Sequence, residues 1–219
     1  MSGTRTLVLA SASPARLALL RAAGIDPIVQ VSDVDEPAIE AALASAGQTD
    51  PGAVCQALAA AKARTSAALI KAVHPDALVI GADSVLDLAG RALGKPADAA
   101  MAFTRWAEMA GCEGMLRTGH HLIDLATGAE VGRTASTVVR FGRPDATELA
   151  AYVASGEPMR VAGAFTLDGL GGAFIDGVDG DPSNVVGLSL PTLRALLADL
   201  GVRWTDLWND DHGRTRTDS

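Results

Sequence analysis

The chain has 219 residues, of which 48% are hydrophobic, and it carries a formal net charge of -8. This length suffices for one sizeable domain or for two lobes around a cleft, and the acidic balance argues against a broad surface for nucleic acid or for an anionic membrane. The two cysteines, Cys55 and Cys112, offer neither a disulfide framework nor the spacing of a metal site. No apolar run reaches the roughly 20 residues that span a bilayer, and no targeting segment is expected. We therefore expect a cytoplasmic protein with one domain over residues 1–205 and a polar tail over residues 206–219.

The first informative stretch runs from Leu7 to Leu20 and reads LVLASASPARLALL. Its opening apolar run predicts a buried strand, and its closing leucines predict the apolar side of a helix. Between them, Pro14 suits the first position of a helix and Ser13 suits its N-cap. A helix N-terminus that follows such a turn attracts anions, and Ser11, Ser13 and Arg16 add donors suited to phosphate. An ordinary capped helix with a surface arginine explains the same stretch equally well.

An acidic turn and two helices follow a short strand predicted over residues 27–31. The turn holds three carboxylates within four residues and ends in Glu36. These carboxylates either decorate a helix N-terminus, which the helix dipole favours, or hold a metal or a water molecule. Helices are predicted over residues 38–46 and 53–73. The second helix carries Lys62 among alanines, and this spacing alone favours a solvated lysine over one that reaches across a cleft.

The second informative stretch lies between residues 76 and 96. The apolar run Ala77–Ile80 predicts a central strand, and Gly81 permits another group to approach closely. Asp83 is then expected at the carboxyl end of this strand, where ligands of α/β sheets tend to bind. A following hairpin is expected to bring Lys95 back toward Asp83. Such a pair is either catalytic or a structural ion pair, and the small residues beside both groups favour catalysis.

The rest of the chain predicts a regular alternation of helices and strands. We expect a helix over residues 98–111, strands over 114–126 and 130–141, a helix over 144–154, short strands with tight turns over 161–190, and a last helix ending near residue 200. Adjacent histidines at 120 and 121 point to opposite faces of a strand, so we expect no shared metal there. Glu157 is either a ligand or a loop acid, and the second interpretation is favoured. The phosphate-loop and dinucleotide-binding glycine motifs are absent from the sequence.

Eight short motifs, taken together, resemble those of Maf-like proteins, which are nucleoside triphosphate pyrophosphatases also described as septum-formation inhibitors. The motifs are LASASPAR, the acidic turn ending in Glu36, Lys62 in its helix, IGADS at 80–84, LGKP at 93–96, SGEP at 155–158, AGAF at 162–165 and NVVGLSLPTLRALL at 184–197. Each motif is weak alone, but all eight follow the family's order over nearly the whole chain.

The resemblance implies a Maf/Ham1 (ITPase-like) α/β fold, elongated, with a mixed twisted sheet flanked by helices and two lobes around a central cleft. It implies hydrolysis of a nucleoside triphosphate to the monophosphate and pyrophosphate, in the removal of non-canonical or excess nucleotides, with a divalent metal such as Mg²⁺ or Mn²⁺. Carried over by position, Asp83 matches the catalytic proton acceptor. The remaining catalytic, phosphate and metal positions match Lys95, Arg16, Glu36, Ser11 and Lys62. Glu36 and Asp83 are the expected metal ligands, and whether Asp83 acts as general base or chiefly as ligand stays open.

Three residues depart from the pattern of members that prefer thymidine and uridine triphosphates. This chain has Ala15, Ser84 and Asp168 at the positions where the pattern of those members has an arginine, a threonine and a glutamine. A carboxylate at 168 accepts hydrogen bonds where an amide also donates them, so the base preference stays open. The resemblance also suggests a homodimer. The alternative functions are a nucleotide-binding regulator of cell division with incidental hydrolysis and a nucleotidyltransferase, which would need a second substrate.

Overall fold

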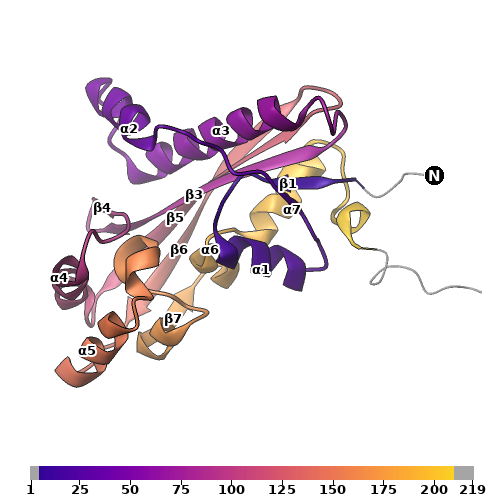
Figure 1. Cartoon of the computed structure of the whole chain (residues 1–219). Coiled ribbons are helices and arrows are strands. Elements are labelled where there is room, and N and C mark those ends of the chain that lie inside the picture. Colours follow the sequence, from indigo (N-terminus) through magenta and orange to yellow (C-terminus); the bar gives the residue numbers. More distant parts are fainter. Residues whose placement is uncertain (1–4, 210–219) are drawn as a thin grey trace, which may run out of the picture.

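The computed structural model describes residues 5–209, which form an elongated α/β molecule built on one seven-stranded sheet (Figure 1). The strands are β1 (Leu7–Leu9), β2 (Ile28–Val29), β3 (Leu78–Leu88), β4 (Arg91–Leu93), β5 (Glu113–Asp124), β6 (Glu130–Phe141) and β7 (Ile175–Asp179). The α-helices are α1 (Pro14–Ala22), α2 (Glu36–Ser45), α3 (Pro51–Ile70), α4 (Ala99–Met109), α5 (Ala146–Ala154), α6 (Pro182–Val186) and α7 (Leu190–Asp199). Four 3-10 helices complete the described part: η1 (Pro158–Arg160), η2 (Ala162–Ala164), η3 (Leu170–Phe174) and η4 (Trp204–Leu207).

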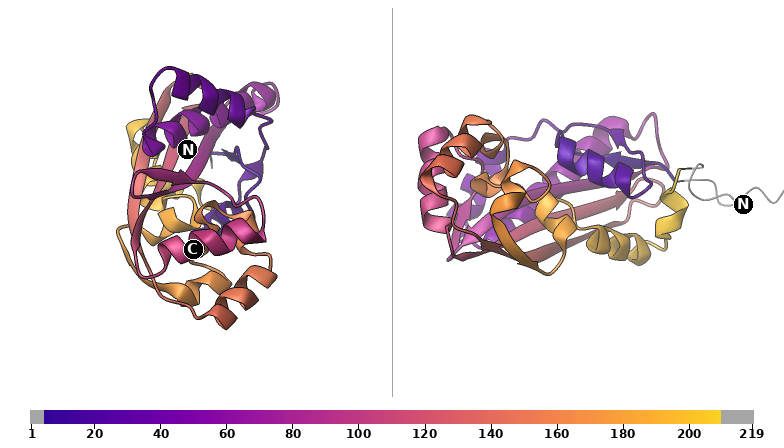
Figure 2. Two further views of the ribbon diagram at one scale, coloured as in Figure 1. Left: turned by 90° about the vertical axis from the view of Figure 1, so that its left-hand side faces the viewer. Right: turned by 90° about the horizontal axis from the view of Figure 1, so that it is seen from below.

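The sheet is mixed, as the family resemblance implied. Its strand order is β2-β1-β3-β5-β6-β7, and β4 pairs with the far end of β3. β1 runs parallel to β2 and β3, whereas β3, β5, β6 and β7 form an antiparallel series. The long strands β3 and β5 therefore run through the whole molecule and join its two ends (Figure 2).

Helices cover both faces of the sheet at the end that contains β1. The strand alternates, so Leu7 and Leu9 face the side of α1 and α7, whereas Val8 faces the side of α3. Leucines of α7 close the first side, and alanines of α3 lie against the second. The two cores thus lie on opposite faces of the sheet, between β1 and the helices that cover it (Figure 1).

A separate aromatic core lies at the other end, where α4 and α5 pack on the sheet. Trp106 is fully buried there, and its ring meets Phe141, Tyr152 and Phe174 edge to face at 5.9 Å. Its indole N–H donates to the carbonyl oxygen of Ala164 at 2.8 Å, which ties α4 to η2. Such edge-to-face pairs add stabilisation beyond the area they bury.

Several of the helices begin after a side-chain N-cap, and the cap expected at Ser13 is confirmed. Ser13, Asp35, Asp50 and Asp98 are N-caps whose side chains accept a hydrogen bond from the first turn of the next helix. Since α2 begins at Glu36, the acidic turn supplies the cap and the first turn of that helix. Its acids are therefore partly explained by the helix dipole.

The glycine-dense region differs from the short strands that the sequence predicted. Between residues 161 and 190 the chain forms two 3-10 helices, the single strand β7 and the short helix α6. The prediction failed because several glycines adopt left-handed backbone, as Gly163 does at φ 69°, and this conformation interrupts an extended chain. Asp181 caps α6, because its side chain accepts a hydrogen bond from the N–H of Ser183, and Pro182 stands in the first turn of that helix.

The end of the described chain packs against its beginning. Leu207 of η4 is buried in the core beside α7, and the backbone N–H of Arg5 donates to the carbonyl oxygen of Asp206. Folded structure thus continues past the boundary expected at residue 205, and the expected tail beyond residue 209 lies outside the described residues. None of the helices within residues 5–209 combines the length and the apolar character needed to cross a membrane.

Candidate active site

A cleft of about 870 Å³ lies between the N-terminus of α1 and the segment that contains η1 and η2. All ten residues singled out from the sequence line this one cleft. They are Ser11, Ser13, Ala15, Arg16, Glu36, Lys62, Asp83, Ser84, Lys95 and Asp168. Residues separated by more than 150 positions in the sequence therefore share one cavity, although their arrangement differs from the expected one in several respects.

The turn before α1 forms one wall of the cleft. Ser11 Oγ accepts a hydrogen bond from the backbone N–H of Ser13 at 3.2 Å, and Ser13 Oγ accepts one from the N–H of Arg16 at 3.4 Å. Pro14 starts the helix, so the turn is fixed by local interactions alone. Its partly exposed hydroxyls and the positive end of the helix dipole face the cavity and suit an anion.

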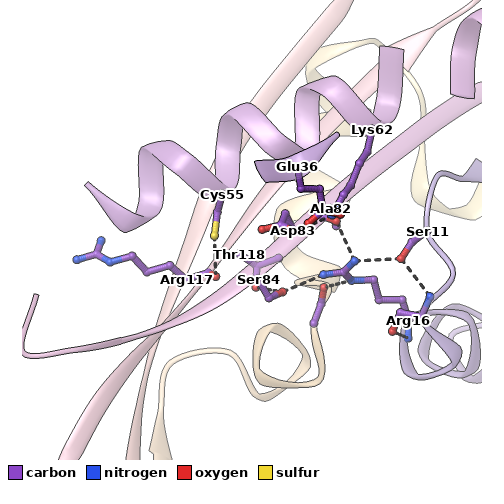
Figure 3. A network of polar contacts seen from close by, with 12 residues as sticks. Ser11, Arg16, Glu36, Cys55, Lys62, Ala82, Asp83, Ser84, Arg117 and Thr118 are labelled. Carbon is purple, nitrogen blue, oxygen red and sulfur yellow. Dashed lines mark hydrogen bonds and ion pairs between the residues drawn. The ribbon is translucent and has the colours of Figure 1, made fainter. Parts of the chain in front are cut away.

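Arg16 is buried and bonded to the protein, which differs from the open phosphate ligand that the sequence predicted. Its guanidinium donates to the carbonyl oxygens of Gly187 and Ala82 and to the hydroxyls of Ser11 and Ser84 (Figure 3). Burial lowers the pKa of Arg16 from its usual range. Four of the five guanidinium N–H groups are thus used, so Arg16 chiefly joins α1, β3 and the end of α6.

Lys62 bridges two carboxylates at the centre of the cleft. Its Nζ lies 2.8 Å from Glu36 Oε1 and 2.6 Å from Asp83 Oδ1. Only 12% of the Lys62 side chain is exposed, so the solvated lysine favoured by its helical spacing is wrong. Figure 3 shows Lys62 and Glu36 directed toward Asp83 from α3 and α2.

Two glycines set the height of Lys62 above the sheet. A Cβ at Gly81 would lie 2.2 Å from the carbonyl oxygen of Ala59, and one at Gly119 would lie 2.4 Å from that of Cys55. Both contacts are impossible for a side chain, so the glycines let the backbone of α3 rest directly on β3 and β5. The close approach expected at Gly81 is confirmed, and the group that approaches is the helix that carries Lys62.

Asp83 lies in the middle of β3, not at a strand end as the sequence predicted. The segment from Gly81 to Ser84 continues the ladder, because Asp83 is in register with Gly119 and Ser84 with Thr118 of β5. Pairing with a long antiparallel neighbour thus overrides the weak strand propensity of the small residues. Asp83 is therefore held on a rigid strand instead of a loop.

Lys95 lines the cleft, but the expected pair with Asp83 is replaced by the pair of Asp83 with Lys62. The hairpin of β3 and β4 does return the chain toward the cleft, as predicted. Within residues 5–209, however, the Lys95 side chain has neither an ion pair nor a hydrogen bond, and it is exposed. Asp83 is therefore paired with Lys62, which α3 carries.

A polar network beneath the cleft supports Ser84. Its hydroxyl lies 2.9 Å from Thr118 Oγ1, which is also within 3.4 Å of the carbonyl oxygen of Asn184. The Asn184 amide donates to Leu116 and to Thr137. Sequence reasoning missed Thr118, because nothing in a strand pattern marks a buried threonine as part of a site, whereas Asn184 stood in a recognised motif without an assigned role.

The opposite wall is built around Glu157. Its carboxylate accepts hydrogen bonds from Thr166 Oγ1 at 2.5 Å, from the N–H of Leu170 at 3.1 Å and from the N–H of Gly171 at 3.0 Å. Burial alone would raise the pKa of Glu157, but these hydrogen bonds outweigh it and hold the pKa below its usual value. Glu157 thus fastens a loop, as the favoured interpretation expected, and it also lines the cleft into which that loop carries Asp168.

The two histidines of β5 point to opposite faces, as predicted. His121 Nε2 lies 2.9 Å from Glu130, whereas His120 Nε2 accepts the N–H of Ser189 at 2.8 Å on the other face. His120 Nδ1–H then donates to the carbonyl oxygen of Thr118. Burial, with a further contribution from Arg16, lowers the pKa of His120 to about 4, so the ring is neutral near pH 7.

The carboxylates of Glu36 and Asp83 fit a divalent metal that is bound together with a phosphate ligand. Both direct an oxygen toward the same point, now occupied by Lys62 Nζ. Among residues 5–209, no group of three or more acids, histidines or cysteines converges in the manner of an all-protein metal cage. Mg²⁺ is commonly bound by one or two carboxylates plus substrate phosphates, and Glu36 and Asp83 are the two carboxylates of this cleft that converge.

Comparisons with known proteins agree on one family. The family model described as "Maf-like protein" matches residues 6–200. A Streptomyces coelicolor protein named "Nucleoside triphosphate pyrophosphatase" is 59% identical over 204 residues, which cover 93% of this chain and 95% of that protein. Proteins of the same name from Streptomyces avermitilis and Nocardia farcinica are 56% and 54% identical, over 93% and 94% of this chain and 95% and 97% of theirs.

Proposed function

Because the chain belongs to the Maf-like protein family, we propose that it is a nucleoside triphosphate pyrophosphatase that hydrolyses its substrate to a nucleoside monophosphate and pyrophosphate. The observation that carries this proposal is the convergence of Glu36, Lys62 and Asp83 in a cleft whose wall is the N-terminus of α1. A triphosphate brings about four negative charges. The cleft offers helix N–H groups, hydroxyls and cations to receive them.

Asp83 is the residue we assign to the attacking water. Its carboxylate is fixed on β3 and oriented by Lys62, so it either accepts a proton from the water or holds the metal that acidifies it. Lys62 also binds Glu36, so both carboxylates are directed toward one point of the cleft. Lys95 supports the phosphate chain from the β4 side of the cleft.

Glu36 and Asp83 are the residues that would hold a divalent metal. Such an ion, when bound with the substrate, neutralises phosphate charge and polarises the bond that breaks. Hard carboxylate oxygens favour Mg²⁺ or Mn²⁺ over thiophilic metals. We propose that the activity is metal-dependent and that the enzyme removes non-canonical or excess nucleotides from the cytoplasm.

Turnover of a nucleotide panel tests the proposal. The protein is incubated with Mg²⁺ or Mn²⁺ and each of the common and base-methylated triphosphates in ¹⁸O-labelled water. We expect a monophosphate that contains the label and unlabelled pyrophosphate, because water attacks the α phosphorus. Release of inorganic phosphate would exclude this reaction, whereas label in pyrophosphate would move the attack to the β phosphorus and leave the products the same.

Two control proteins separate catalysis from binding. Asp83→Asn is expected to bind nucleotide without turnover, and Asp179→Asn removes an exposed acid outside the cleft and should behave as the unmodified chain. A regulator of cell division with incidental hydrolysis would instead bind nucleotide tightly and turn it over only slowly, both in the unmodified chain and in Asp179→Asn. The panel also reports the base preference, which Ala15, Ser84 and Asp168 do not determine by their chemistry alone.

A further inference from the structure

Four cationic side chains line the cleft, and they differ in what they already bind. Arg16 donates four hydrogen bonds to the protein, and Lys62 holds two carboxylates. Lys95 and Arg160 are exposed to the cavity, and neither side chain has an ion pair or a hydrogen bond within the described part of the chain. The cations that remain available for a ligand are therefore Lys95 and Arg160.

Backbone contacts hold these two residues on the same side of the cleft. Arg160 ends η1, and three residues later the N–H of Gly163 donates to the carbonyl oxygen of Gly94 at 3.0 Å. The guanidinium of Arg105 donates to the same oxygen. The turn before Lys95 is thus fastened to the segment that follows Arg160, so the two free cations are held on one side of the cleft.

We propose that Arg160 binds the phosphate chain of the substrate together with Lys95, while Arg16 positions the α1 turn from beneath. This inference rests on the proposed function and names a residue that sequence reasoning did not select. A guanidinium presents paired N–H groups that match phosphate oxygens, and it stays charged at every working pH. The acids of the cleft, Glu36, Asp83, Glu157 and Asp168, balance its four cations. Arg16 and Lys62 are already engaged, so a polyphosphate that enters meets Lys95 and Arg160 as its free counter-charges.

Binding of inorganic tripolyphosphate tests the proposal without any base. Calorimetry is carried out on the full chain, on Arg160→Ala, on Arg160→Lys and on the control Arg194→Ala, which removes an exposed arginine of α7 outside the cleft. We expect Arg160→Ala to weaken binding about 10- to 100-fold, as the loss of a charge-assisted hydrogen bond does. Arg160→Lys should recover part of this loss, and Arg194→Ala should change binding less than about twofold.

Nucleotide kinetics distinguish phosphate binding from base recognition. For Arg160→Ala we expect KM to rise by a similar factor for every accepted triphosphate, with a smaller change in kcat. A loss confined to one base, or tripolyphosphate binding equal to that of the unmodified chain with an unchanged melting temperature, would overturn the inference. If the unmodified chain releases no pyrophosphate but binds tripolyphosphate through Arg160, the pyrophosphatase proposal fails and the assignment of Arg160 stands.

Discussion

Replacing His120 by glutamine tests whether this buried histidine lowers the free energy of unfolding as the pH falls below 7. His120 is fully buried, and burial and the charge of Arg16 lower its pKa from 6.5 to about 4. Between these values the unfolded chain binds a proton that the native chain excludes, so the free energy of unfolding falls as the pH falls. The lowered pKa corresponds to a loss of about 2 kcal/mol at pH 5 and about 3 kcal/mol at pH 4, and to none above pH 7.

The assay is urea unfolding followed by tryptophan fluorescence at intervals between pH 7.5 and pH 4. Glutamine keeps an acceptor for the N–H of Ser189 but has no charge to gain. The free energy of unfolding of His120→Gln should therefore decline less steeply than that of the unmodified chain, with a difference that grows by about 3 kcal/mol between pH 7 and pH 4. His74→Gln removes a partly exposed histidine and serves as the control.

Parallel curves for the unmodified chain and His120→Gln would refute the reasoning. They would mean that His120 binds its proton in the native state at the same pH as in the unfolded chain, so that at low pH the N–H of Ser189 would have no acceptor at Nε2. The same conclusion follows if the free energy of unfolding of His120→Gln declines with pH as steeply as that of the control His74→Gln.

Three further substitutions examine the site and its support. Asp83→Asn should lower kcat by at least about 100-fold while the melting temperature changes little, and unchanged turnover would remove Asp83 from its assigned role. Gly81→Ala should lower the free energy of unfolding by about 3 kcal/mol in urea titrations, because the added methyl group meets the backbone of α3. Gly94→Ala is the control, because the space around Gly94 is open, and an equal effect of the two substitutions would contradict this account. Glu157→Gln should lower the free energy of unfolding by about 2 kcal/mol and raise KM, because an amide oxygen replaces a charged acceptor of three hydrogen bonds. If both the stability and KM equal those of the unmodified chain, Glu157 does not fasten the loop.

Much of the fold was predictable because its signals are local. Ser13 followed by Pro14 marks the start of α1, which begins where these residues predict, whereas α3 begins at Pro51, two residues before its expected start. The apolar run of β1 and the long strands β5 and β6 were likewise evident from pattern alone. The grouping of the site residues was predictable only from the family resemblance, because nothing in their spacing brings positions 16 and 168 together.

The remaining errors all concern partners that are distant in the sequence. Lys62 reads as a surface lysine on its own helix, and only the contact of α3 with Gly81 and Gly119 brings it to Asp83. The continuity of β3 depends on pairing with β5, which no local propensity reports. The partners of Arg16 and Arg160 were likewise unpredictable from the sequence. Arg16 donates to Gly187 and Ala82, which are distant in the sequence, whereas Arg160 lines the cleft and stays free for a ligand.

The packing of the first strand in one core with the last turns has a consequence for how the protein is made. β1 lies inside the sheet, and the core around it is completed by Leu197 and Leu207. A ribosome releases Leu9 nearly two hundred residues before Leu207, so the nascent chain must keep an incomplete apolar surface from aggregating for most of its synthesis. We expect folding to complete only after release, and truncation before η4 to yield insoluble protein even though the catalytic cleft would be intact in composition.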